Sequence, residues 1–180
     1  MPCFPVAVLL VLCATALGTD ATYTLKDVEE ALSTRGPIWI ALRNFDSVAG
    51  TGVDCVYDKV KLKTGNDYTL EHGYNYQSKT RKTTLYATAG QDGNQAYLDV
   101  KESESGQGNR HVLEHWDKAK HCFILKYENT TASRVQCQLH LWASSVTSYH
   151  GNRFECQEKY DQICGGTKHE VYKTTCPTPA

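Results

Sequence analysis

The sequence has no excess of charge of either sign, because its 19 lysines and arginines are balanced by 20 aspartates and glutamates. A chain with a net charge of −1 offers no electrostatic footprint for nucleic acid or for an anionic membrane. The one basic cluster, Lys79, Arg81 and Lys82, is interpreted as a solvated loop. We therefore expect neither nucleic acid nor a membrane as a partner.

Motifs for catalysis and for metal binding are also missing. The chain contains no GxSxG, HExxH, GxGxxG or DxDxDG sequence. His111 and His115 would share a face of one strand, but no third metal ligand accompanies them. No CxxC pair occurs, so a zinc site is a poor alternative explanation for the cysteines. We expect no enzyme activity, no cofactor and no metal.

Long apolar runs are confined to the start of the chain. The run PVAVLLVLCATALG ends in small residues, with Ala16 and Gly18 placed for signal peptidase. It is too short for a comfortable membrane span, and no later segment approaches the ~20 apolar residues that a span needs. We expect residues 1–18 to be a cleaved signal peptide and residues 19–180 to form one secreted, monomeric domain.

Cleavage after Gly18 would remove Cys3 and Cys13 and leave an even number of cysteines. In a secreted chain, this predicts three disulfides, although six cysteines allow 15 pairings. Asn129 begins an Asn-Thr-Thr sequon, so we also expect a glycan in the turn that contains it. The six remaining cysteines are Cys55, Cys122, Cys137, Cys156, Cys164 and Cys176.

Short strand-like runs separated by turn signals make up most of the chain. A short helix is predicted over Thr24–Leu32, with Thr24 as its N-cap. Eight runs of this kind predict an all-β, eight-stranded, antiparallel up-and-down barrel that holds one small ligand. A β-sandwich is the alternative. The runs are 37–45, 53–64, 67–77, 83–89, 95–103, 110–116, 121–127 and 135–142.

The hairpin formed by the last two runs indicates which face is the inner one. Alternation places Phe123 on the face opposite Cys122, and His140 with Trp142 on the face opposite Cys137. Residues 152–164 follow with helical periodicity, and their cysteines lie on one stripe. We therefore expect a C-terminal helix stapled to the outside of the sheet, with the aromatic face of the hairpin turned toward the interior.

Polar and aromatic residues are predicted to share this interior. Asp58 faces inward if the alternating lysines of its strand face solvent. The next strand turns His72 and Tyr74 inward together with further tyrosines. An aromatic interior with scattered polar groups is typical of a small-molecule pocket, but a core whose hydroxyl groups satisfy one another is an equal alternative.

The hairpin and the helix resemble the tick salivary lipocalins. The amine-binding signature of that family runs Cys-Asp-aliphatic, Glu-Leu-aromatic, Cys; here it becomes Cys122-Phe123-Ile124, His140-Leu141-Trp142 and, after thirteen residues, Cys156. The resemblance covers the whole mature chain and implies a lipocalin barrel with its C-terminal helix outside. It implies the disulfides Cys55–Cys176 and Cys122–Cys156 and leaves Cys137 with Cys164.

The resemblance further implies that the barrel sequesters a host inflammatory mediator, either a biogenic amine or a lipid such as a leukotriene. A buried ammonium ion needs a carboxylate partner. This chain has Phe123 and His140 in place of the two acids of the signature, which leaves Asp46 and Asp58 for histamine or serotonin.

A lipid carboxylate would instead require cationic donors. Arg43, Arg110 and His121 resemble the Arg, Arg and His of the soft-tick leukotriene binders. We therefore expect a leukotriene-like ligand, with its tail along Phe123, Trp142 and the tyrosine face. The alternatives are an amine ligand, a plain ion pair between Arg43 and Asp46, and inhibition of a host plasma protein through the loops.

Overall fold

The computed structural model describes residues 22–46, 52–129, 134–146 and 153–179. The predicted signal peptide lies outside these ranges. Asn129 ends a strand, but its side chain and the rest of its sequon also lie outside the described part. None of the helices in these ranges has the length and apolar character needed to cross a membrane.

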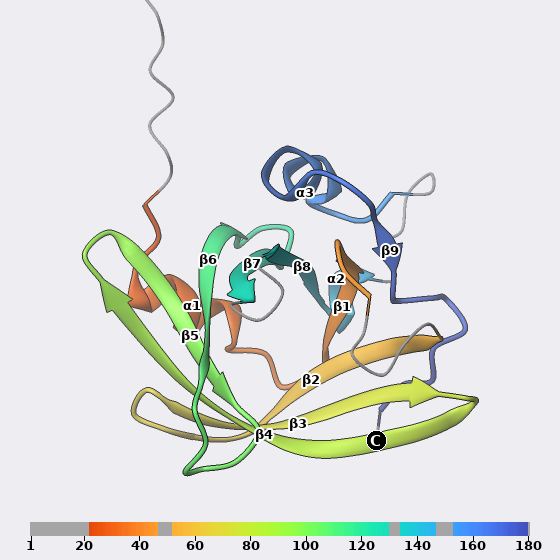
Figure 1. Cartoon of the computed structure of the whole chain (residues 1–180), viewed down its shortest axis with the longest axis horizontal. Coiled ribbons are helices and arrows are strands. Elements are labelled where there is room, and N and C mark those ends of the chain that lie inside the picture. Colours follow the sequence, from red (N-terminus) through yellow and green to blue (C-terminus); the bar gives the residue numbers. More distant parts are fainter. Residues whose placement is uncertain (1–21, 47–51, 130–133, 147–152, 180) are drawn as a thin grey trace, which may run out of the picture.

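The strands form one antiparallel sheet that closes on itself (Figure 1). β1 pairs with β8 on one side and with β2 on the other, through Ile38 with Asp58 and Trp39 with Tyr57. The predicted eight-stranded up-and-down barrel is therefore confirmed, and the sandwich alternative is wrong. The strands are β1 (Ile38–Arg43), β2 (Val53–Thr64), β3 (Asp67–Tyr76), β4 (Lys79–Asp92), β5 (Gln95–Lys101), β6 (Asn109–Asp117), β7 (Cys122–Asn129), β8 (Arg134–Trp142) and the short β9 (His169–Glu170), which adds to β1.

The predicted N-terminal helix forms as α1 (Leu25–Ala31) and covers one end of the barrel (Figure 1). Its start is fixed by Asp27, whose carboxylate accepts hydrogen bonds of 2.7 Å from the backbone N–H and the hydroxyl of Thr24. Its end is held to the barrel, because the indole N–H of Trp142 donates to the Ala31 carbonyl at 2.8 Å. Leu32, directly after the helix, contributes to the barrel interior.

The C-terminal helix forms as α3 (Gln157–Cys164) and lies outside the sheet over β7 and β8 (Figure 1). Tyr160 of this helix is fully buried against the outward faces of Leu139 and Leu141. A further short helix, α2 (Ala143–Val146), was not predicted. The disulfides join Cys55 with Cys176, Cys122 with Cys156, and Cys137 with Cys164, which is the pairing that the resemblance implied.

Candidate functional site

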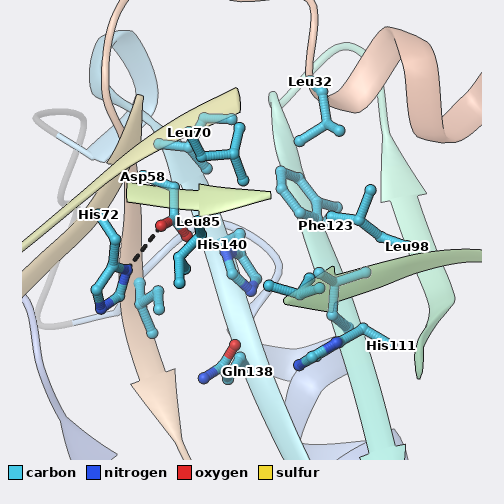
Figure 2. Close-up of a pocket in the computed structure, with 14 residues that line it drawn as sticks. Leu32, Asp58, Leu70, His72, Leu85, Leu98, His111, Phe123, Gln138 and His140 are labelled. Carbon is cyan, nitrogen blue, oxygen red and sulfur yellow. Dashed lines mark hydrogen bonds and ion pairs between the residues drawn. The ribbon is translucent and has the colours of Figure 1, made fainter. Parts of the chain in front are cut away.

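A cavity of about 130 Å³ lies inside the barrel (Figure 2). Most of its wall is aliphatic, and Phe123 adds one aromatic ring. The polar groups come from four strands, so no single segment of the sequence contains the site. The lining residues are Leu32, Ile38, Ile40, Asp58, Leu70, His72, Leu85, Leu98, Val100, His111, Phe123, Leu125, Gln138 and His140.

Asp58 and His72 form an ion pair in the wall of the cavity. The two residues are cross-strand partners on β2 and β3, and Nδ1 of His72 lies 2.7 Å from Oδ1 of Asp58. Burial lowers the pKa of His72, but the charge of Asp58 and its hydrogen bond outweigh burial and raise this pKa above its ordinary value. Burial raises the pKa of Asp58, yet the histidines lower it overall, His72 most strongly. Among the described lining residues, Asp58 is the sole acid, and none is a lysine or arginine.

Two further histidines face the same space without a charge at neutral pH. His140 stacks on Phe123 with ring centres 4.7 Å apart, and its Nε2 is buried without a hydrogen-bond partner. Burial lowers the pKa of His140 to about 4 and also lowers the pKa of His111. His111 and Gln138 lie at the end of the cavity opposite Leu32 (Figure 2). The cavity thus combines one ion pair with neutral hydrogen-bonding groups in an apolar wall.

Two residues of the sequence-predicted site, Arg110 and Asp46, lie on the outer surface and do not line the cavity. Arg110 is half exposed, its Nε lies 3.2 Å from Asp99, and its guanidinium covers the ring of Tyr97. The register of β6 against β5 turns Arg110 outward and His111 inward. Asp46 follows the end of β1, is largely exposed and lies 3.4 Å from His169.

Arg43, the last residue of β1, is buried but does not line the cavity. Its neighbour on β8 is Gln138, which does. Its guanidinium lies 5.7 Å from the centre of the Phe45 ring, and its Nε is buried without a hydrogen-bond partner. Burial lowers the pKa of Arg43, while Asp46 and Tyr127 raise it. In the described part of the chain, no carboxylate lies within 4 Å of Arg43, so the ion pair considered between Arg43 and Asp46 is not present.

The remaining predicted residues flank the cavity. His121 stacks on Trp142 with ring centres 4.2 Å apart at the end covered by α1. Tyr74 lies beyond His72 on β3, at 5.8 Å between ring centres. Of the sequence-predicted set, Asp58, Phe123 and His140 line the cavity. His72, His111 and Gln138 also line the cavity but were not among the predicted site residues, although alternation along β3 had placed His72 on an inward face.

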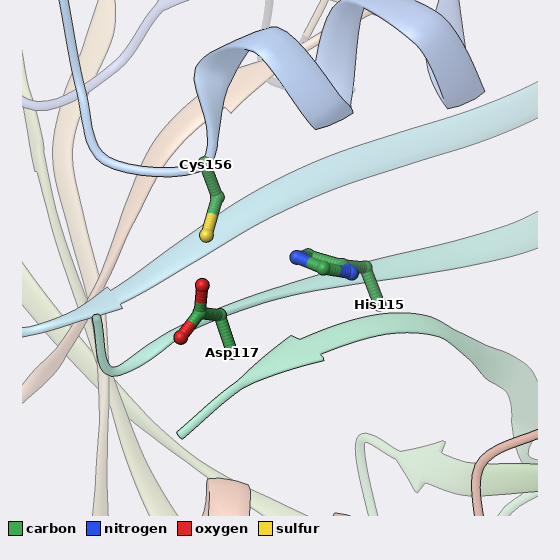
Figure 3. Close-up of side chains that lie close together, drawn as sticks. All are labelled: His115, Asp117 and Cys156. Atoms are coloured by element: carbon green, nitrogen blue, oxygen red, sulfur yellow. The ribbon is translucent and has the colours of Figure 1, made fainter. Parts of the chain in front are cut away.

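A second cluster of polar side chains lies outside the barrel, where His115, Asp117 and Cys156 meet (Figure 3). One potential ligand atom from each lies within 4.8 Å of the others. Cys156 is bonded to Cys122 and offers no thiolate, and Nδ1 of His115 is 3.0 Å from the Tyr23 hydroxyl. This cluster is therefore two ligands beside a disulfide rather than a three-ligand metal centre.

Comparison with known proteins identifies one family and several solved structures of similar fold. The family model described as tick histamine binding protein matches residues 18–178. The solved structure of AM182 in complex with serotonin is 17% identical, with a TM-score of 0.60 over 84% of this chain and 94% of that one. Japanin from Rhipicephalus appendiculatus, bound to cholesterol, is 15% identical, with a TM-score of 0.55 over 82% of this chain and 98% of that one. No curated protein matches the sequence.

Proposed function

Because the chain belongs to the tick histamine-binding protein family, we propose that it is a secreted scavenger of a compact biogenic amine such as histamine. The observation that carries this proposal is the Asp58 carboxylate, the sole acid in a cavity lined by no lysine or arginine among the described residues. A buried ammonium ion needs such a counter-ion. The three disulfides fit an extracellular protein.

The size of the cavity supports a ligand with one ring. A cavity of about 150 Å³ lined by apolar side chains holds one benzene molecule, and pockets for drug-sized ligands have roughly 300–1,000 Å³. The cavity of this barrel has about 130 Å³. An imidazole ring with a two-carbon ammonium arm fits this range, whereas a twenty-carbon chain requires the barrel to open.

The neutral polar groups suit the ring of such a ligand. His140 has a buried nitrogen without a partner, and a ring N–H or hydroxyl would satisfy it. The face of Phe123 and the aliphatic wall would contact the apolar carbons. With the ammonium at Asp58, the ring would extend toward His140, His111 or Gln138.

A lipid carboxylate such as that of a leukotriene is the second candidate, and Arg43 is the observation that favours it. This guanidinium is buried, no carboxylate among the described residues lies within 4 Å, and its Nε lacks a partner. A chain threaded from the cavity past Gln138 would bring an anionic head group to Arg43. To admit the lipid tail, the aliphatic side chains that now enclose the cavity would have to move apart, and this repacking would cost free energy.

Calorimetric titration of the mature protein at pH 7.4 with histamine, serotonin and leukotriene B4 tests the ranking. We expect histamine to bind most tightly, serotonin more weakly because of its second ring, and leukotriene B4 weakest. Tight binding of leukotriene B4 without any heat from histamine would contradict the amine proposal. In that case Arg43→Gln should weaken leukotriene binding by about tenfold to a hundredfold, as expected for one charge-assisted hydrogen bond.

A further inference from the structure

The geometry points to an exchange of cations at Asp58: we propose that an incoming ammonium ion takes the place of the proton on His72, so that each bound amine releases up to one proton. This inference rests on the amine-binding function proposed above and adds the role of His72 to it. His72 is thus a resident competitor for the carboxylate rather than a second attractive group for the ligand.

The competitor is held in place by the sheet. Asp58 and His72 face each other in the β2–β3 ladder, so the backbone register fixes the 2.7 Å contact between Nδ1 and Oδ1. Both side chains are mostly buried, with 22% of His72 and 17% of Asp58 exposed. The other titratable groups that line this space are His111 on β6 and His140 on β8, and the ring of Tyr74 lies beside His72.

Charge balance in the cavity explains why the proton must leave. Asp58 raises the pKa of His72, so below this raised pKa the empty site contains an imidazolium–carboxylate pair. A bound ammonium would add a second cation beside one carboxylate, in surroundings of low dielectric constant. Burial lowers the pKa values of His111 and His140, so neither contributes a further charge. Transfer of the His72 proton to solvent restores a single ion pair, now between the ligand and Asp58.

The exchange makes the affinity depend on pH in a defined direction. An alkylammonium group, with a pKa near 10, keeps its proton while His72 loses one. Below the pKa of His72, each unit of falling pH should weaken binding by up to about tenfold, because one proton competes with one ligand. Above that pKa, His72 is already neutral, and the affinity should become constant.

Calorimetry in two buffers of different ionisation enthalpy measures the released protons, with histamine as the probe at pH 6.5 and pH 8.5. The control is His72→Gln, whose amide can still donate to Asp58 but does not titrate. Any proton linked to the histamine ring is common to both proteins. We expect the wild type to release about half to one proton more than His72→Gln at pH 6.5, and this difference to become smaller at pH 8.5. His72→Gln should also bind histamine several-fold more tightly at pH 6.5.

Equal proton release by the two proteins at pH 6.5, with binding that still requires Asp58, would overturn the exchange and leave the proposed function intact. Failure of histamine to bind either protein, or undiminished binding by Asp58→Asn, would overturn the proposed function and the exchange with it. Circular dichroism of each variant verifies that it is folded before these outcomes are read.

Discussion

Replacing Asp58 by asparagine should raise the Kd for histamine about a hundredfold. The substitution keeps the size of the side chain and removes its charge, so the bound ammonium would be buried without a counter-ion. Loss of one partner of a buried charge pair costs about 3 kcal/mol or more, and each 1.4 kcal/mol corresponds to a factor of ten. Calorimetric titration of wild type and variant at pH 7.4 measures this change.

Asp46→Asn is the matched control for this prediction. Asp46 is the other acid that the sequence suggested for an amine site, but it is largely exposed and lies beside His169. Its replacement should change the Kd for histamine less than twofold. A large effect of Asp46→Asn, together with normal binding by Asp58→Asn, would move the cation site out of the cavity.

A second large effect concerns stability in acid and arises from His140. Burial lowers the pKa of this side chain to about 4, whereas an unfolded histidine has a pKa near 6.5. Between these values the unfolded state binds a proton that the folded state does not bind, so folding stability falls as the pH falls from 6.5 to 4. A difference of this size corresponds to roughly 3 kcal/mol.

The variant His140→Leu removes this group from the titration. Relative to this variant, the wild type should lose roughly 3 kcal/mol of unfolding free energy between pH 7 and pH 4, as measured by urea unfolding. Phe123→Leu, which changes the ring stacked on His140, should lower stability without changing the slope against pH. If the unfolding free energies of wild type and His140→Leu changed in parallel with pH, His140 would bind its proton equally well in the folded and unfolded states. That result would contradict the prediction.

The architecture was predictable because most of its signals are local. Alternation along β7 and β8 separates Phe123 and His140, which line the cavity, from Cys122 and Cys137, which face the outer helix. In β2, the alternating lysines indicate the outer face and so place Asp58 on the inner one. The disulfide pairing was available through the family resemblance, since six cysteines alone leave 15 possibilities.

The set of residues around the cavity was less predictable, because it depends on register between strands. β6 has a bulge between Leu113 and His115, so its sequence contains no clean alternation from which to choose between Arg110 and His111. β1 has a similar irregularity between Ile40 and Leu42, before Arg43. A one-residue shift exchanges the inner and outer faces, and only the pairing with neighbouring strands decides it.

The nature of the ligand was the least predictable part. The sequence contains arginines that suit a lipid carboxylate, and the expectation of a leukotriene followed from them. In the fold, Arg110 is engaged by Asp99 on the surface, and Arg43 lies beyond the cavity. The volume of the cavity, and the set of side chains that line it, are properties of the closed barrel, which no local pattern encodes.

A crystal structure of the mature protein with histamine tests the central claim most directly, because it locates the ammonium group. We predict that the ammonium nitrogen lies about 2.7–3.0 Å from a carboxylate oxygen of Asp58, with the imidazole ring inside the barrel beside Phe123 and His140. Histamine bound at Asp46 or elsewhere on the surface, with the cavity empty, would contradict the claim.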